Sequence, residues 1–185
     1  MNTEINQIQQ LPKLIWLTGL SGAGKTTLSN GLYALLKENG FISIVLDGDD
    51  IRKTVNRDLG FTLNDRTENL RRVAEISRLF LDLNIIVIAA FISPLASDRE
   101  MIKKITGKDR YTEIYVNTPL EICEQRDVKG LYKKARNSEI SNFTGLSSAY
   151  EIPNQPDFMI NTVDYTPEQC TDQLYQFVIN KINTV

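Results

Sequence analysis

A short glycine-rich stretch has the residue types and the spacing that bind phosphate. It follows an apolar run at residues 14–17 and precedes a helical pattern of leucines, the strand–turn–helix context that the spacing G-x-x-x-x-G-K-[ST] requires. Glycines let several backbone N–H groups converge on one phosphate, and the helix N-terminus adds partial positive charge. The pattern predicts a nucleoside triphosphate site made by Gly19, Leu20, Ser21, Gly22, Ala23, Gly24, Lys25, Thr26 and Thr27.

Two side chains of this stretch have distinct expected roles. Lys25 can reach the β- and γ-phosphates, and the hydroxyl of Thr26 is placed to ligate Mg²⁺. The alternative is a glycine-rich turn between a strand and a helix that binds no ligand. Because spacing and context agree, we favour the nucleotide site over that alternative.

Two aspartates follow a second apolar run at residues 41–46. Asp47 and Asp49 flank a glycine at the carboxyl end of the predicted strand, where open α/β sheets bind ligands. Asp49 could hold Mg²⁺ through water or accept a proton from an acceptor hydroxyl. Taken alone, the pair fits a turn equally well.

Hydrogen-bond donors are concentrated between residues 52 and 72. Arg66 and Asn69 lie three apart on a predicted helix and share a face with which, together with Arg52, they could grip phosphate or sulfate oxygens. The alternative is a solvated helix face with weak surface ion pairs. The residues of that face are Arg71, Arg72, Arg78, Glu68 and Glu75.

Two aromatic residues, Phe61 and Phe143, lie in polar loops that contain glycine. Exposed aromatic rings in such loops can stack on a nucleobase. Alternatively, they anchor their loops on the core, which is the more common role of an aromatic side chain.

The segment of residues 127–141 is polar and basic, with lysines and an arginine between Lys129 and Arg136. It is typical of a mobile cover that closes over a nucleotide and excludes water. The alternative is an ordinary solvated helix.

Strands alternate with helical patterns along the chain. This alternation predicts one α/β domain of the P-loop NTPase class, with a mostly parallel five-stranded sheet flanked by helices. We expect a loose polar leader at residues 1–12 and the nucleotide-binding domain at 13–185. The predicted strands are residues 14–18, 41–46, 85–90, 111–116 and 157–161. Four helix starts are predicted. Asn64 or Asp65 caps one helix and Ser97 caps another, Pro119 lies in the first turn of a third, and Thr166 and Pro167 begin the last.

Composition excludes several kinds of chemistry. The 185 residues contain no histidine, so histidine bases, histidine metal ligands and phosphohistidine intermediates are excluded. A net charge of −2 argues against general binding to nucleic acid or membranes. There is no signal-peptide pattern and no apolar run long enough to span a bilayer, and two cysteines are too few for a disulfide framework. We therefore expect a cytoplasmic protein.

An ordered series of motifs between about residues 13 and 161 resembles the adenylylsulfate kinases, also called APS kinases. Beyond the phosphate loop, the series includes Leu-Asp-Gly-Asp-Asp-Ile-Arg and Asn-Arg-Asp-Leu-Gly-Phe. It continues with Asp-Arg-Thr-Glu-Asn-Leu-Arg-Arg, Phe-Ile-Ser-Pro and Phe-Thr-Gly. The motifs occupy residues 46–52, 56–61, 65–72, 91–94, 123–136, 143–145 and 150–151.

The resemblance implies transfer of the γ-phosphoryl group of ATP, with Mg²⁺, to the 3′-hydroxyl of adenosine 5′-phosphosulfate. It implies that Asp49 orients or deprotonates that hydroxyl. By the same resemblance, Arg52, Arg66 and Asn69 hold the phosphosulfate and ribose, Phe61 and Phe143 clamp the adenine, and the main chain of Ile92 and Ser93 contacts the substrate. Lys129 comes from the lid, and Arg126 lies near the ATP base. A homodimer and an ATP sulfurylase partner are also implied.

Ser93 matches a serine that has been assigned in this family as a phosphoserine intermediate. Since the chain has no histidine and no neighbouring base is evident, we expect direct in-line transfer instead.

The chain also departs from the common pattern. It has Ser141 where relatives commonly carry lysine, Asp50 where asparagine is usual, and unusual residues at Ser147 and Ala149. We expect weaker substrate affinity but an active enzyme. Two alternatives stay open: a P-loop kinase for another hydroxyl acceptor, and a nucleotide-binding regulator without catalysis.

Overall fold

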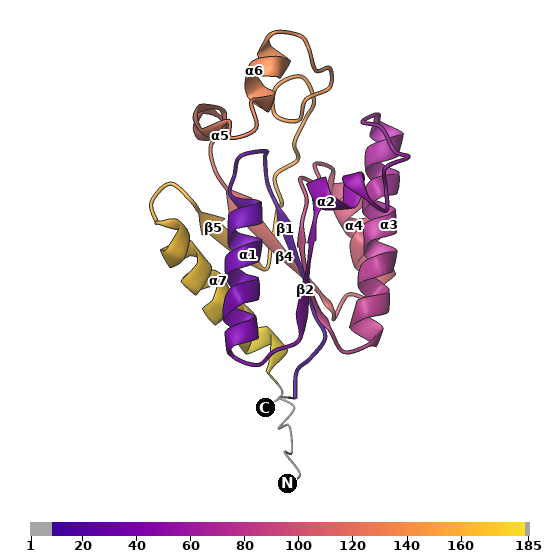
Figure 1. Cartoon of the computed structure of the whole chain (residues 1–185), viewed down its shortest axis with the longest axis vertical. Helices are drawn as coiled ribbons and strands as arrows, with labels where there is room; N and C mark the ends of the chain where they lie inside the picture. Colours follow the sequence, from indigo (N-terminus) through magenta and orange to yellow (C-terminus); the bar gives the residue numbers. More distant parts are fainter. Residues whose placement is uncertain (1–8, 184–185) are drawn as a thin grey trace.

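Five parallel strands form a single sheet in the computed structural model, which describes residues 9–183 (Figure 1). The strand order is β2-β3-β1-β4-β5, and each of the four pairings is parallel. This confirms the predicted α/β class. The strands are β1 (Leu14–Thr18), β2 (Ser43–Asp47), β3 (Ile86–Ala90), β4 (Tyr111–Asn117) and β5 (Phe158–Asn161).

Helices cover both faces of the sheet, with α1 and α7 on one side and α3 and α4 on the other (Figure 1). The helices are α1 (Lys25–Glu38), α2 (Gly48–Lys53), α3 (Leu63–Asp82), α4 (Ala96–Thr106), α5 (Leu120–Arg126), α6 (Leu131–Arg136) and α7 (Pro167–Ile182).

The central strand β1 shows why its sequence is apolar throughout. All five of its side chains are buried, because a parallel sheet with helices on both faces leaves no strand face in water. Ile15 and Leu17 pack in the core cluster that contains residues of α1 and α7, whereas Leu14 and Trp16 pack in the cluster that contains residues of α3 and α4. The strand therefore lies at the centre of the core.

Two helices begin with capping boxes. Thr166 caps α7, as the sequence predicts. For α3 the prediction of Asn64 or Asp65 is wrong: Thr62 is the N-cap, and Asp65 is the third helical residue that completes the box. Asn64 lies inside the helix, because the hydroxyl of Thr62 already accepts the N–H of Asp65 at 3.2 Å.

The start of α4 also differs from the prediction that Ser97 would cap it. The helix begins at Ala96, and Leu95, at the N-cap position, provides no side-chain bond. Instead, the carboxylate of Glu151 accepts the backbone N–H of Ala96 at 2.6 Å. A residue 55 positions away satisfies this helix end, which no local pattern could indicate.

Loops gather at the carboxyl ends of the strands, the end at which α6 lies in Figure 1. The predicted leader at residues 1–8 lies outside the described part of the chain. Within residues 9–12, the prediction of a loose leader is wrong for Gln10. This residue is 6% exposed, and its side chain donates to the carbonyl oxygens of Ile42 and Asn84. Within residues 9–183, no helix is both long and apolar enough to cross a bilayer.

Candidate active site

The phosphate loop connects β1 to α1 and requires glycine at specific points. Gly22 and Gly24 have φ angles of 76° and 105°, in the left-handed region that side chains disfavour. A Cβ at Gly22 would also lie 3.0 Å from the carbonyl oxygen of Cys123. The loop therefore packs tightly against the start of α1 and the helix α5.

Lys25 is buried beside this loop, with 9% of its surface exposed. Its ammonium group donates to the carbonyl oxygens of Gly19 and Leu20 at 2.9 and 2.7 Å. Burial lowers the pKa of Lys25 to about 8, so the side chain is mainly protonated at pH 7. A cation held inside the phosphate loop is suited to a polyphosphate.

Thr26 and Asp47 bring the phosphate loop and the end of β2 together. The Thr26 hydroxyl donates to Oδ2 of Asp47 at 2.8 Å, and Oδ1 of Asp47 accepts the N–H of Asp49 at 2.9 Å. Sequence reasoning treated Asp47 only as a turn residue. Its position after a strand, like that of Asp49, was the available signal.

These oxygens fit the Mg²⁺ ion that the sequence implies. Mg²⁺ prefers oxygen ligands and is usually bound by one or two protein groups, with phosphate oxygens and waters completing the shell. Thr26 and Asp47 provide a hydroxyl and a carboxylate at one point. Among the described residues, no group of three or more acidic, histidine or cysteine side chains could hold a metal.

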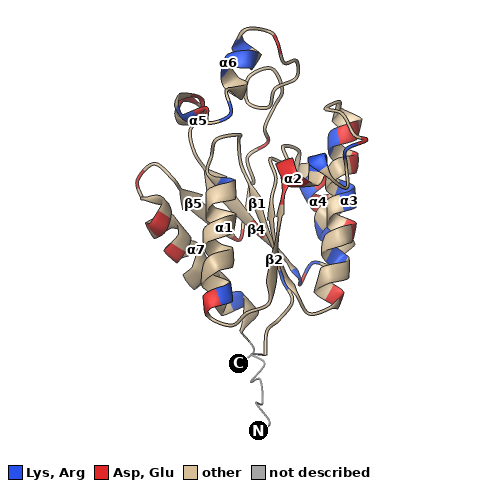
Figure 2. Cartoon of the chain, in the orientation of Figure 1, with Lys and Arg blue, Asp and Glu red and all other residues tan. Residues whose placement is uncertain are grey.

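Asp49 lies in the first turn of α2, and its carboxylate forms an ion pair with Lys129. Both side chains are about half exposed, at 52% each. Lys129 precedes α6, the basic helix that lies beyond the ends of the strands in Figure 2. The basic segment therefore contacts the sheet end at the predicted acceptor carboxylate.

Arg52, Phe61 and Arg66 form one cluster beside α2 and α3. The guanidinium of Arg66 donates to the carbonyl of Phe61 and to Thr144 Oγ1, at 3.0 and 2.9 Å. Arg52 donates to the Gly60 carbonyl at 2.9 Å, and its guanidinium carbon lies 4.6 Å from the centre of the Phe61 ring. Phe61 is 66% exposed, so the cluster presents one open aromatic ring and two cations.

Phe143 differs from Phe61. It anchors its loop on the core, the second of the two roles that the sequence left open: the side chain is 7% exposed, and its ring packs edge-on against Tyr132 with 4.9 Å between ring centres. Tyr132 is itself buried and donates to the carbonyl of Ser21 at 2.9 Å. The basic segment 127–141 thus includes a core residue, contrary to expectation, and Tyr132 anchors it on the phosphate loop.

Asn69 is buried at 3% exposure, and its side-chain oxygen accepts the amide of Asn56 at 3.0 Å. It therefore lies beneath the surface between α3 and the loop that carries Phe61. The sequence had placed it with Arg66 on one helix face.

The neighbouring arginines form the solvated face that was the alternative interpretation. Arg71 and Arg72 both bond Glu68, and Arg72 also reaches Asp58. The mixed charges along α3 are visible in Figure 2. Both surface pairs expected from the sequence, Glu68 with Arg72 and Glu75 with Arg78, are present.

We expect Glu68 to make stability depend on pH. Hydrogen bonds from Arg71 and Arg72 lower the pKa of Glu68 to about 2. Because the folded pKa lies below the unfolded value, its stabilisation is complete above about pH 4.5 and is lost as the pH falls toward 2. Since the carboxylate is partly exposed, Glu68→Gln should lower the free energy of unfolding at pH 7 by only about 1 kcal/mol.

Urea unfolding at pH 7 and at pH 3 measures this difference. Glu75→Gln, on the same helix, is the matched control. The ion pairs of Glu75, at 3.1 and 3.8 Å, are longer than those of Glu68, so its replacement should have a smaller effect. A Glu68→Gln deficit that is equal at both pH values would contradict the prediction.

Ser93 is buried at 2% exposure in the loop after β3. Its hydroxyl accepts the indole N–H of Trp16 and donates to Thr18 Oγ1, both at 2.9 Å. Thr18 in turn donates to the carbonyl of Ile92 at 2.7 Å. The Ser93 hydroxyl is therefore fully engaged with the interior of the protein.

Arg126, at the end of α5, lies beside the phosphate loop. Its guanidinium donates to the hydroxyl and the carbonyl oxygen of Thr162 at 3.0 and 2.8 Å, and lies 3.5 Å from the Gly22 carbonyl. This placement is adjacent to the loop, on the side of β5, away from Asp49.

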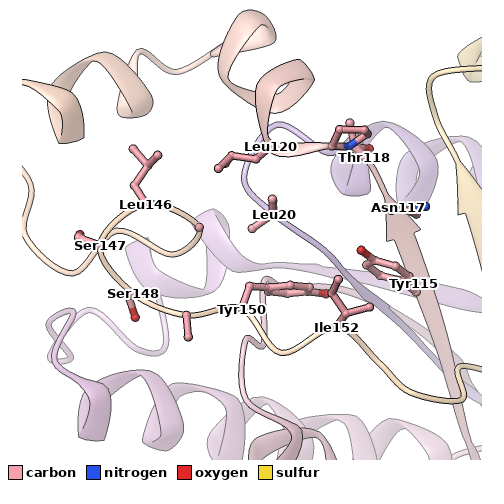
Figure 3. Close-up of a pocket in the computed structure, with 13 residues that line it drawn as sticks. Leu20, Tyr115, Asn117, Thr118, Leu120, Leu146, Ser147, Ser148, Tyr150 and Ile152 are labelled. Atoms are coloured by element: carbon pink, nitrogen blue, oxygen red, sulfur yellow. The ribbon is translucent and has the colours of Figure 1, made fainter.

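A hollow of about 610 Å³ lies on another side of the phosphate loop (Figure 3). Leu20 of the loop, Tyr115 of β4 and Tyr150 border it, and the two tyrosine rings stack with 6.3 Å between centres. None of Asp49, Arg52 and Phe61 lines it. The predicted acceptor residues are therefore a separate cluster.

Comparison with known proteins gives a consistent result. A family model for adenylylsulphate kinase matches residues 11–161. An adenylyl-sulfate kinase of Bacteroides thetaiotaomicron is 51% identical over 169 residues, which is 91% of this chain and 84% of that protein. One from Clostridium acetobutylicum is 47% identical over 171 residues, covering 92% and 85% of the two chains.

A solved structure is similar throughout. The APS kinase of Mycobacterium tuberculosis, in complex with AMPPNP and APS, superposes with a TM-score of 0.87 at 39% identity. The match covers 91% of this chain and 98% of that one.

Proposed function

This chain belongs to the adenylylsulphate kinase family, and on that premise we propose how its residues divide the reaction between them. The enzyme is an ATP-dependent kinase that phosphorylates the 3′-hydroxyl of adenosine 5′-phosphosulfate, giving 3′-phosphoadenosine 5′-phosphosulfate and ADP. The observation that carries the assignment of residues is the hydrogen bond between Thr26 and Asp47, which joins the phosphate loop to the turn that holds Asp49.

The donor half is the phosphate loop. Its backbone N–H groups and the start of α1 bind the ATP phosphates, and Lys25 turns its ammonium group from the loop carbonyls to the β- and γ-phosphates. Arg126 lies beside the adenine of ATP. Thr26 and Asp47 would hold Mg²⁺, which neutralises phosphate charge when bound.

The acceptor half is the cluster around α2 and α3. The 3′-oxygen of the acceptor attacks the γ-phosphorus, and Asp49 accepts the proton of that hydroxyl. The bond between the γ-phosphorus and the oxygen that leaves with ADP breaks in the same step. Lys129 supplies positive charge at the same point, supported by its ion pair with Asp49. Arg52 and Arg66 hold the phosphosulfate and ribose, and the main chain of Ile92 and Ser93 completes the contacts. Asn69 belongs to the same grip and, because it is buried against Asn56, supports it from beneath.

Phe61 is the exposed ring on which the substrate adenine stacks. Phe143 is the second face of the clamp, and its packing on Tyr132 ties that face to the basic segment. We propose that residues 127–141 act as the lid, with Tyr132 as its fixed point on the phosphate loop.

Direct in-line transfer explains Ser93 better than a phosphoserine intermediate. A nucleophilic hydroxyl needs a base and access to the phosphoryl group, whereas that of Ser93 is buried and donates its proton to Thr18. We expect Ser93→Ala to keep turnover within about tenfold of the parent, since only positioning bonds are lost. Intact-mass spectrometry of the parent after incubation with ATP should show no phosphoryl adduct. Lost turnover with unchanged substrate binding would overturn this expectation.

A coupled assay of ADP release with adenosine 5′-phosphosulfate tests the function itself. The chain should turn over this acceptor with ATP, and Lys25→Ala gives the background. A screen of other small hydroxyl acceptors tests the alternative kinase. ATP binding without turnover of any acceptor would favour a regulator and overturn the proposal.

The finer predictions are part of the same proposal. They are a homodimer, an ATP sulfurylase partner, a cytoplasmic location and a role in sulfate assimilation.

Asp50 departs from the asparagine that is usual at this position in the family. Its side chain is 80% exposed and lies 3.8 Å from Lys53, so solvent screens its additional charge. This supports an active enzyme.

A further inference from the structure

Arg99 is a buried cation outside the groups assigned to the reaction. Its surface is 5% exposed, and its guanidinium makes contacts in three directions. Nε pairs with the carboxylate of Glu113 on β4 at 3.0 Å, Nη1 donates to the Ser93 carbonyl at 2.8 Å, and Nη2 donates to the Glu151 carbonyl at 2.9 Å. A buried charge is tolerated when it is paired and hydrogen-bonded in this way.

The contact to Ser93 is made at a strained point of the backbone. Ser93 has a φ of 39°, in the left-handed region that a residue with a side chain seldom adopts. Such a conformation persists only when several contacts fix it. Trp16 and Thr18 fix the side chain of Ser93, and Arg99 fixes its carbonyl group.

The same guanidinium reaches the segment that follows the lid. The backbone carbonyl of Glu151 accepts the bond from Arg99, and its backbone N–H donates to the Pro94 carbonyl at 2.8 Å. Its carboxylate accepts the N–H of Ala96. Next to it, the hydroxyl of Tyr150 lies 3.0 Å from that of Thr18. The chain leaving the lid is therefore fastened to the loop that contains Ser93, and Arg99 lies at the junction.

We propose that Arg99, with Glu113 as its counter-ion, is a positioning residue for the acceptor half of the site. It sets the main chain of Ile92 and Ser93 and links that loop to the segment that follows the lid, without contacting the substrate. The inference rests on the proposed function, because those main-chain groups are its acceptor contacts. The phosphate loop has no hydrogen bond to Arg99 among the described residues, so the donor half should be unaffected.

Steady-state kinetics of Arg99→Met and Arg99→Lys test this separation. We expect Arg99→Met to raise KM for adenosine 5′-phosphosulfate by about 10- to 100-fold, since a small displacement of binding groups has effects of this size. KM for ATP should change by less than about twofold. Arg99→Lys keeps the charge and one bond, and should recover part of the loss. Equal rises in both KM values, or no rise for the acceptor, would overturn the proposal.

Arg110 offers a matched control at the other end of the sheet. Like Arg99, it pairs with a carboxylate, that of Asp82 at 2.6 Å, and donates to a backbone carbonyl, that of Thr106 at 2.8 Å, whereas Arg99 bonds two carbonyls. Arg110→Met should leave both KM values unchanged. Glu113→Gln, which retains the Arg99 bonds to Ser93 and Glu151, should shift the acceptor KM in the same direction by less. It serves as the test if Arg99→Met fails to fold, and an unchanged acceptor KM would then count against the proposal.

A second readout needs no turnover. Trp16 is the single tryptophan, its N–H bonds Ser93, and its ring stacks on Phe91 with 5.1 Å between centres. Arg99→Met or Glu113→Gln should change the tryptophan emission or its acrylamide quenching, and Arg110→Met should not. If the parent shows no turnover of adenosine 5′-phosphosulfate, the proposed function fails, whereas an unchanged emission in both Arg99→Met and Glu113→Gln contradicts the role of Arg99 directly.

Discussion

Asp49→Ala is expected to lower kcat by about 100- to 10,000-fold, the range typical of a lost general base. The carboxylate lies in the first turn of α2, at the sheet end that holds the phosphate loop, and Lys129 contacts it. Since Asp49 acts on the acceptor hydroxyl, the loss should appear in kcat, with KM for ATP little changed. The coupled ADP-release assay under saturating ATP measures it.

Asp50 provides the matched control for this substitution. It is the next residue on the same short helix, and its carboxylate is 3.8 Å from Lys53, whereas that of Asp49 pairs with Lys129 of the lid. Asp50→Ala should leave kcat within about twofold of the parent. If Asp49→Ala kept the full rate, Asp49 could not be the base, and the acceptor hydroxyl would have to lose its proton to another group.

Replacing Lys25 by methionine is the second substitution with a large expected effect. Methionine fills similar buried space but removes the only charge that the phosphate loop itself carries. We expect kcat/KM for ATP to fall by about 100- to 1,000-fold, the size of effect found when one charge-stabilising donor is removed from a transition state. The rise in Tm that ATP produces by binding the folded chain should also shrink.

Lys37, in the last turn of the same helix, is the control for Lys25. Lys37→Met removes an equal charge from α1 at the end away from the phosphate loop, and it should leave both the kinetics and the ATP-induced rise in Tm unchanged. If the Lys25→Met protein keeps both the ATP-induced rise in Tm and the turnover, Lys25 has no role in binding ATP or in phosphoryl transfer.

Much of the fold could be predicted from local patterns. The apolar run of β1 and the glycine spacing after it indicate a strand and a phosphate-binding turn, because both depend on residues that are neighbours in the chain. The cap at Thr166 is local in the same way. The boundary at Thr62 was missed because Asn64 and Asp65 are also good caps, and only the backbone path decides among adjacent candidates.

The site was predicted in part. Lys25, Thr26 and Asp49 follow from motif and strand position, and the structure brings their segments to one end of the sheet. The bond between Thr26 and Asp47 was not foreseen, since it depends on how closely β1 and β2 bring their ends together across β3. For Phe61 and Phe143 the sequence left exposure and anchoring both open, because a loop sequence does not show that Tyr132 lies against Phe143 alone.

The sequence by itself determined the kind of chemistry. A glycine-rich turn with this lysine and threonine spacing, between a strand and a helix, is suited to binding phosphate, and a chain without histidine has carboxylates and cations for acid–base and charge-neutralising roles. The tertiary structure decided which groups act together: the Glu151 carboxylate at the start of α4, the Ser93 hydroxyl turned to Trp16, and Arg99 among three segments. Three of these bonds, Glu151 to Ala96, Arg99 to Glu151 and Trp16 to Ser93, join residues 52 to 77 positions apart, and only the packing of the strands and loops brings such residues within hydrogen-bond distance.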